Sequence, residues 1–240
     1  MQNYGSGQGT AVYELGGMRV EVRPLLRMVY MWMTLGLLAT TGIAITVASS
    51  PALLQLATNP IILFGSIIGQ LILVVALSAG VRRMSQNLAT VLFFVYAGLN
   101  GLVFSLLFYV YDLGSIALAF LTAAGLFGAM TVVGFTTKMD LTRFGSYLLM
   151  GLIGLIIAMV VNLFLGSGPL DFLISIVGVL LFTALTAYDT QKIKLMAADP
   201  KLEADGSLTA KLSIMGALTL YLDFINLFLF LLRLFGSGRD

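Results

Sequence analysis

The sequence predicts an all-α integral membrane protein in which seven transmembrane helices cross the bilayer. Of the 240 residues, 59% are hydrophobic and only 10% are charged, whereas soluble domains carry about 25% charged residues. The mean hydropathy is +1.02. The apolar residues form long continuous stretches, whereas the strands of membrane β-barrels alternate apolar and polar residues. The membrane-spanning segments are therefore expected to be helices.

Seven stretches have the length of about 20 apolar residues that a helix needs to cross a bilayer. Short polar connections separate them, several with turn residues such as Asn59-Pro60. We expect a polar, glycine-rich tail over residues 1–27, a transmembrane domain over 28–236 and a C-terminal tail over 237–240. The expected spans lie at about 28–48, 61–81, 88–110, 116–136, 146–166, 172–190 and 213–235.

Basic residues predict how the chain is oriented in the membrane. Eleven of the 13 Lys and Arg residues fall in the N-terminal tail and in the second, fourth and sixth connections. The other two follow the last span. Since cytoplasmic segments of membrane proteins are enriched in Lys and Arg, the N-terminus is expected in the cytoplasm and the C-terminus outside, as an odd number of spans requires.

The composition also excludes several kinds of chemistry. The chain has no Cys and no His, which excludes disulfides, thiolate metal sites, His metal ligands and catalytic Ser–His or Cys–His pairs. We expect no cofactor and no enzymatic activity. The net charge of +2 gives no indication of a nucleic-acid partner, so the lipid bilayer is the partner that the composition predicts.

Two aspartates are the most informative polar residues. Asp223 lies between Lys211 and Arg233, about 15–18 Å from either at the rise of an α-helix. A carboxylate at that depth costs about 2.5–3.5 kcal/mol on insertion scales, so it serves either a function or a structural hydrogen bond. Asp189 is three residues before Lys192 and is either a functional group or a solvated charge at a helix end.

The sequence alone does not bring the two aspartates together. Counted along the spans, Asp223 lies about two turns deeper than Asp189. If both faced the same interior, their carboxyls would titrate as a coupled unit. Their oxygens would also suit a hard cation such as Ca²⁺, which makes them candidate metal ligands.

Four amides are weaker candidates for a polar lining. Asn226 is three residues after Asp223 and therefore on the same helical face. For each of the four, interhelical hydrogen bonding is the simpler interpretation. They are Gln70, Asn100, Asn162 and Asn226.

Three segments make the sequence resemble the transmembrane Bax inhibitor motif family, in its bacterial inner-membrane branch. The run Leu-Tyr-Leu-Asp-Phe-Ile-Asn-Leu-Phe at 220–228 resembles the signature last helix of that family. Residues 186–194, Thr-Ala-Tyr-Asp-Thr-Gln-Lys-Ile-Lys, resemble the end of its sixth helix. Residues 127–141 are similar to its fourth helix and the loop that follows.

The resemblance implies a fold in which the last helix is central and the other six surround it. It also implies a pH-sensitive Ca²⁺ leak in which Asp189 and Asp223 share a proton and act as the pH sensor. An arginine at the cytoplasmic end of the second helix can latch to the sixth-helix aspartate; Arg82 is the better match and Arg83 its neighbour. Some members also carry a glutamate in the second helix. This chain has no acid between Glu21 and Asp112, and Gln70 is the nearest polar residue.

Three functional hypotheses follow from these residues. The first is a proton-gated cation leak, in which protonation changes the spacing of Asp189 and Asp223. The second is an intramembrane aspartyl protease; such proteases carry Gly-x-Gly-Asp, whereas this chain reads Tyr221-Leu222-Asp223. The third is a non-conducting interaction protein that regulates membrane proteases or membrane protein quality control.

Overall fold

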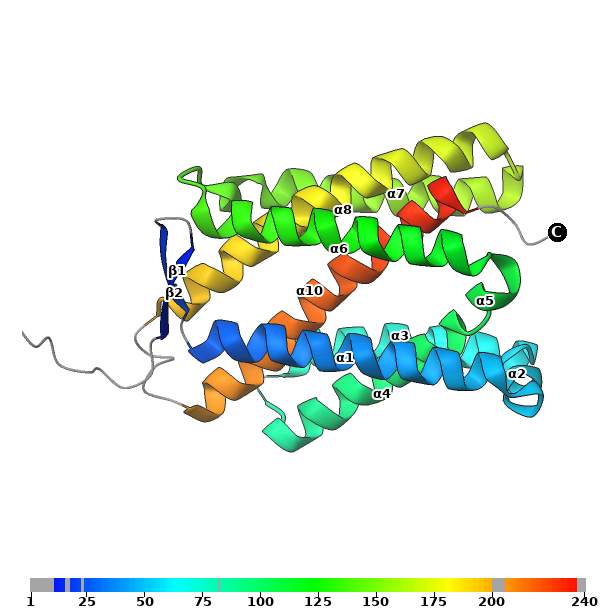
Figure 1. Cartoon of the computed structure of the whole chain (residues 1–240), viewed down its shortest axis with the longest axis horizontal. Coiled ribbons are helices and arrows are strands. Elements are labelled where there is room, and N and C mark those ends of the chain that lie inside the picture. The colour runs from blue at the N-terminus through cyan, green and yellow to red at the C-terminus, as the bar shows by residue number, and fades with distance from the viewer. Residues whose placement is uncertain (1–10, 16–17, 23, 82, 200–205, 237–240) are drawn as a thin grey trace, which may run out of the picture.

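The computed structural model confirms a helical membrane protein with seven candidate spans (Figure 1). It describes residues 11–15, 18–22, 24–81, 83–199 and 206–236. Within these ranges, seven helical segments are long and apolar enough to cross a bilayer. They are α1 (Pro24–Ser49), α3 (Pro60–Gly80), α4 (Gln86–Phe104) continued by α5 (Leu107–Val110), α6 (Leu113–Thr136), η1 (Leu141–Phe144) continued by α7 (Gly145–Leu165), α8 (Gly168–Ala197) and α10 (Gly206–Phe235).

The structure differs from the expected boundaries in three places. A short helix, α2 (Pro51–Ala57), follows α1, and residues of the expected N-terminal tail form the antiparallel strands β1 (Ala11–Leu15) and β2 (Met18–Val22). The sequence of β2, Met-Arg-Val-Glu-Val, alternates apolar and polar residues, a pattern typical of strands. The third difference is that α8 and α10 extend well into the connection expected over 191–212.

Side-chain caps define where several helices begin. Asn59 accepts a hydrogen bond from the backbone of Ile61, and Pro60 occupies the first helical position of α3. Ser85 and Asp112 cap α4 and α6 in the same way, at 3.2 Å and 2.9 Å. These residues satisfy N–H groups that a helix leaves unpaired, so each cap defines where its helix begins.

The last helix, α10, forms the centre of the bundle. In its most apolar stretch 72% of the residues are buried, against at most 33% in any other span. It packs against α8, α1, α6, α4 and α3, while α7 packs chiefly on α8. Figure 1 shows α10 crossing obliquely between the layer of α1 and that of α6 and α8. The central position expected for the last helix is confirmed.

A hydrogen-bonded junction fixes α10 to α1 and α4. The hydroxyl of Tyr221 lies 2.7 Å from that of Thr40, which in turn donates to the backbone oxygen of Ala97 at 2.9 Å. The rings of Phe93 and Tyr96 meet the Tyr221 ring edge to face. All of these side chains are buried, so the junction holds three helices together by packing and by satisfied polar groups.

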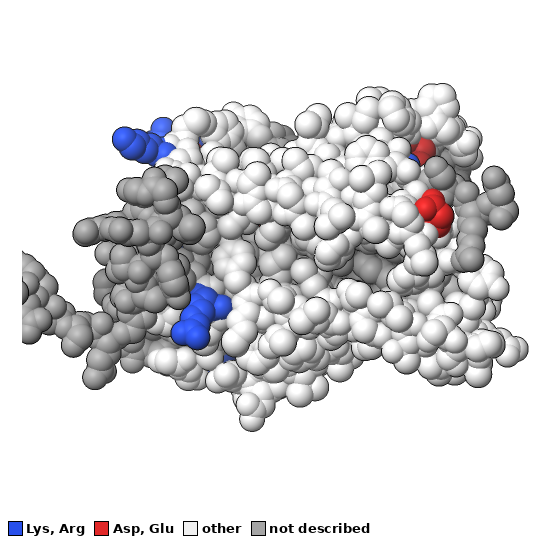
Figure 2. All heavy atoms as spheres, viewed as in Figure 1, with Lys and Arg blue, Asp and Glu red and all other residues white. Residues whose placement is uncertain are grey.

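Charged side chains gather at the two ends of the bundle, and apolar side chains cover the faces between them. Figure 2 shows Lys and Arg at the end where α1 begins and acidic residues at the opposite end. Large apolar side chains on the outer faces of α3 and α7 are exposed, including Phe64, Leu163 and Phe164. This distribution is the one that a bilayer requires of the surface it contacts.

Candidate functional site: a buried pair of carboxyl groups

The structure brings Asp189 of α8 and Asp223 of α10 together inside the bundle. Their carboxyl groups lie close enough to interact directly, and the residues are only 8% and 4% exposed. The expected separation of two turns in depth is therefore wrong. Counting residues along each span assumed helices that run parallel to the membrane normal, whereas α8 and α10 cross the bundle obliquely (Figure 1).

Gly178 allows α8 and α10 to approach on one side of the pair, because a Cβ atom there would lie 2.6 Å from the Phe230 ring. On the other side, a Cβ atom at Gly216 of α10 would lie 2.9 Å from Val29 of α1 and 3.4 Å, an ordinary packing distance, from Ile193 of α8. These contacts place the antiparallel helices in register, with Asp189 facing Asp223 between them. The length of α8, which ends two turns beyond Asp189 at Ala197, is what puts this acid inside the bundle instead of at a helix end.

The pair has few polar neighbours. Oδ2 of Asp223 is buried and has no hydrogen-bond partner among the residues that the structure describes. Within the same residues, Lys192 is the one cation that acts on Asp189, and its ammonium group lies 5.7 Å from the Tyr188 ring centroid. Two neighbouring carboxyls can form a hydrogen bond only if one of them carries a proton.

The carboxyl pair does not by itself make a calcium site. Ca²⁺ takes about 6–8 oxygen ligands, and two carboxyls supply four at most. Over the described parts of the chain, no group of three or more acidic residues could hold a metal ion. A cation at this point would need further oxygens from water or from backbone carbonyls, so the pair is better suited to share a proton than to retain a metal.

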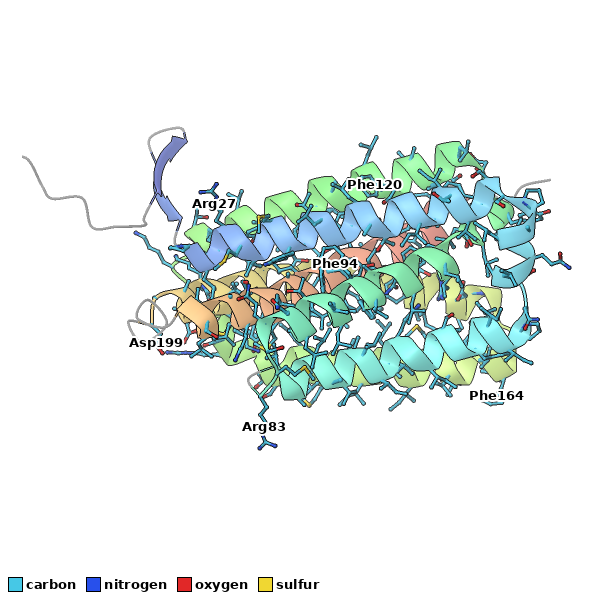
Figure 3. The ribbon with its side chains drawn as sticks, turned by 90° about the horizontal axis from the view of Figure 1, so that it is seen from below. Arg27, Arg83, Phe94, Phe120, Phe164 and Asp199 are labelled. Atoms are coloured by element: carbon cyan, nitrogen blue, oxygen red, sulfur yellow. The ribbon has the colours of Figure 1, made fainter. Side chains whose placement is uncertain are left out.

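Of the two arginines expected to latch to Asp189, only Arg83 is among the residues that the structure describes. Arg82, the better candidate from the sequence, lies outside the described residues. Arg83 is exposed, and its side chain points away from the bundle (Figure 3). The part that either plays in the site remains a prediction.

Three of the four amides bond locally instead of across helices. Nδ2 of Asn100 donates to Tyr96 O at 3.0 Å, and Nδ2 of Asn226 donates to Leu222 O at 2.8 Å, each within its own helix. Asn162 accepts from the backbone of Ser167 at the end of α7. These bonds replace the interhelical bonds that we expected for these three residues. Nε2 of Gln70 is buried and has no hydrogen-bond partner among the described residues.

A cluster of three buried hydroxyls has no signal in the sequence. Tyr30 of α1 lies close to Thr131 of α6 and Thr190 of α8, yet none of the three hydroxyls has a partner at hydrogen-bonding distance within the described ranges. Thr190 directly follows Asp189 in the chain. Three helices that are distant in the chain contribute one hydroxyl each, so only the packed structure could reveal this polar cluster.

The fold and the site together define a class of protein: a seven-helix membrane protein whose central last helix shares a buried carboxyl pair with the sixth span. Comparison with known proteins then identifies the family. Residues 22–240 match the family described as "Inhibitor of apoptosis-promoting Bax1", and the chain belongs to this Bax inhibitor family.

Bacterial relatives resemble the chain over nearly its whole length. The inner membrane protein YbhL of Escherichia coli strain K12 is 48% identical, over 92% of this chain and 94% of the relative. A protein of Rickettsia prowazekii is 46% identical over 91% of this chain and 92% of the relative. A protein of Borreliella burgdorferi is 43% identical over 90% and 92%.

Proposed function

We propose that this protein is a pH-sensitive cation leak of the inner membrane, with Ca²⁺ as the first ion to test, and that Asp189 and Asp223 gate it. The observation that supports the proposal is the contact between two buried carboxyls at the α8–α10 interface. Membrane spans rarely hold buried acids without a function. These two acids are contributed by the central helix and by a helix packed closely against it.

A change in protonation would alter the fit of α8 against α10. A shared proton holds the carboxyls together, whereas two unprotonated carboxylates at the same separation repel each other strongly in a medium of low dielectric constant. The deprotonated pair therefore needs a compensating cation. That cation is either a permeant ion or the guanidinium of Arg82 acting as a latch. Protonation removes the charge that holds such a latch, so we expect flux to rise as the pH falls.

Ion flux into proteoliposomes tests this proposal. The wild-type chain is expected to give Ca²⁺ entry that changes from about pH 5 to about pH 8. Asp189→Asn and Asp223→Asn each preserve the size of the side chain but cannot exchange the proton, so both variants should give flux that no longer depends on pH. Asp112→Asn is the matched control, because Asp112 caps α6 at the end of the bundle, and it should keep the wild-type pH profile.

Two outcomes would count against the gate. Unchanged pH-dependent flux in Asp223→Asn would show that this carboxyl does not control passage. Background flux at every pH in the wild-type chain, for Ca²⁺ and for monovalent cations alike, would show that the protein does not conduct.

A second candidate is a non-conducting protein that binds other membrane proteins, such as membrane proteases, and regulates them. The lack of a third acid near the pair, within the residues that the structure describes, favours it over a channel with a resident Ca²⁺. A stoichiometric partner that co-purifies from membranes, together with absence of flux, would support this candidate. Neither candidate makes the protein an enzyme; cleavage of a model transmembrane peptide that is lost in Asp189→Asn would oppose both.

We also propose an orientation in the membrane. The end of the bundle where Lys and Arg gather (Figure 2) would face the cytoplasm, with the N-terminus on that side and the C-terminus outside. The name of the Escherichia coli relative, an inner membrane protein, supports the choice of membrane. Labelling of single cysteines introduced at Arg83 and at Gly166 from each side of intact cells would test it.

A further inference from the structure

The end of the bundle opposite the basic one holds a polar cavity of about 430 Å³. It lies where α7 ends and α8 begins, and Tyr111, Asn162, Asp171 and Arg233 contribute its polar side chains. Its volume is within the range of about 300–1,000 Å³ that is typical of ligand sites. None of these residues takes part in the carboxyl pair or in the proposed gate.

The two charges in this cavity face each other without forming a hydrogen bond. Nη1 of Arg233 is 3.7 Å from Oδ1 of Asp171, and the side chains keep 43% and 49% exposure. A separation of 3.7 Å is too long for a hydrogen bond, so both groups can still bind a ligand. The guanidinium lies 5.7 Å from the Phe230 ring centroid, a cation–π contact that holds it at this position.

A second cavity continues the first toward the centre of the membrane. It has a volume of about 230 Å³ and shares Met159 and Arg233 with the polar cavity. Leu152, Leu155 and Ile156 of α7 form its apolar wall. Asn226 also lines it, seven residues before Arg233 on α10, so the groove descends about 10 Å along the helix.

We propose that this groove binds a phospholipid whose headgroup carries both a phosphate and a primary ammonium, such as phosphatidylethanolamine. Arg233 would bind the phosphate, Asp171 the ammonium, and the apolar cavity the upper part of an acyl chain. The opposite charges of the protein match those of a zwitterionic headgroup. The neighbouring side chains of Leu163 and Phe164 are 80% and 84% exposed, so the groove opens onto the surface that lipid covers.

Native mass spectrometry of the purified full-length chain tests the proposal. Phosphatidylethanolamine, phosphatidylglycerol and phosphatidylcholine are added at equal concentration, and the bound fractions are compared. An exposed charge pair changes an equilibrium by up to about fivefold, so phosphatidylethanolamine should exceed the other two by about threefold to fivefold. Asp171→Asn should remove its advantage over phosphatidylglycerol, and Arg233→Gln should lower the binding of all three lipids.

Two controls separate the headgroup from the acyl chain and from nonspecific charge. Asp140→Asn removes another exposed acid paired with an arginine, Arg143, at 3.1 Å and at the opposite end of the bundle; it should leave the lipid preference unchanged. Ile156→Trp should reduce retention of every phospholipid without changing the preference. Thermal unfolding of each variant verifies that it is folded.

The proposal is overturned by equal binding of the three lipids to the wild-type chain, or by a preference that survives in folded Asp171→Asn. Displacement of the lipid by an equal concentration of O-phosphoethanolamine, which has the same charged groups but no acyl chain, would also overturn it, because the site would then recognise a soluble molecule without the acyl chain. The flux through the proposed gate is measured separately, so failure of either proposal leaves the other standing.

Discussion

The hydrogen bond between Tyr221 and Thr40 gives a quantitative prediction about how α10 is held in place. Since Thr40 donates its single hydroxyl proton to a backbone oxygen, Ala97 O at 2.9 Å or Gly36 O at 3.0 Å, Tyr221 donates to Thr40. Tyr221→Phe removes one buried hydrogen bond and leaves the donation by Thr40 intact. We expect a loss of about 0.6–1.7 kcal/mol in the free energy of unfolding, the range found for side-chain bonds between membrane helices.

Thr40→Val should cost more, about 1–3 kcal/mol, because it leaves the Tyr221 hydroxyl buried without a partner. Tyr221 is 0% exposed and Thr40 is 3% exposed, so water cannot replace the lost bond. In the double variant the unpaired hydroxyl is absent. The double variant should therefore be more stable than the sum of the single changes predicts, by about 0.6–1.7 kcal/mol.

Denaturant titration of the four proteins in detergent micelles measures this coupling. Thr46→Val serves as the control, since Thr46 is exposed and its hydroxyl bonds only Gly42 O of the same helix, at 2.7 Å. It should change stability little. Additivity of the Thr40 and Tyr221 changes within about 0.3–0.5 kcal/mol would refute the reasoning, because it would mean that the two hydroxyls do not stabilise each other.

Two further predictions concern packing and capping. Gly178→Leu should destabilise the bundle by about 1–3 kcal/mol, because the added Cβ would lie 2.6 Å from the Phe230 ring. Gly154→Leu should not destabilise it, because no atom lies within 4 Å of the added Cβ. Equal unfolding free energies for the two variants would contradict this prediction. Hydrogen bonds from the Ser115 side chain and backbone hold the pKa of Asp112 below its ordinary value of 3.8. The cap therefore stabilises the fold above that pH and loses its effect as the pH falls further. Asp112→Ala should lower the unfolding temperature near neutral pH but not in strong acid, and a difference that persisted in acid would exclude this origin.

The spans were predictable from the sequence because bilayer thickness and hydropathy determine them. Their ends were less predictable where charged residues continue a helix beyond the apolar stretch. The expected sixth span ended at residue 190, but α8 continues through Lys192 and Lys194 to Ala197. The ammonium group of Lys194 donates to Phe135 O at 2.7 Å, a contact with α6 that stabilises the extension and that hydropathy does not record.

The candidate site was predictable in its residues but not in its geometry. Asp223 was evident because a lone acid within an apolar span is expensive, and the resemblance paired it with Asp189. Their contact depends on the tilt of two helices and on small residues such as Gly178, and neither is encoded in the depth of a residue along its own span. The hydroxyls of Tyr30 and Thr190 were missed because Tyr and Thr are common in membrane helices and these residues carry no spacing that links them.

The burial of α10 has a consequence for the order in which the protein is assembled. In the chain, α10 follows the six other spans, yet it is the helix around which they pack. During synthesis, α1, α4, α6 and α8 enter the membrane before the surface that unites them exists. Until α10 arrives, these helices present their inward faces, including Asp189 and Thr40, to lipid or to an insertion factor. The bundle can therefore be completed only after α10 has been synthesised, and a chain interrupted before Gly206 would lack the surface that unites the other helices.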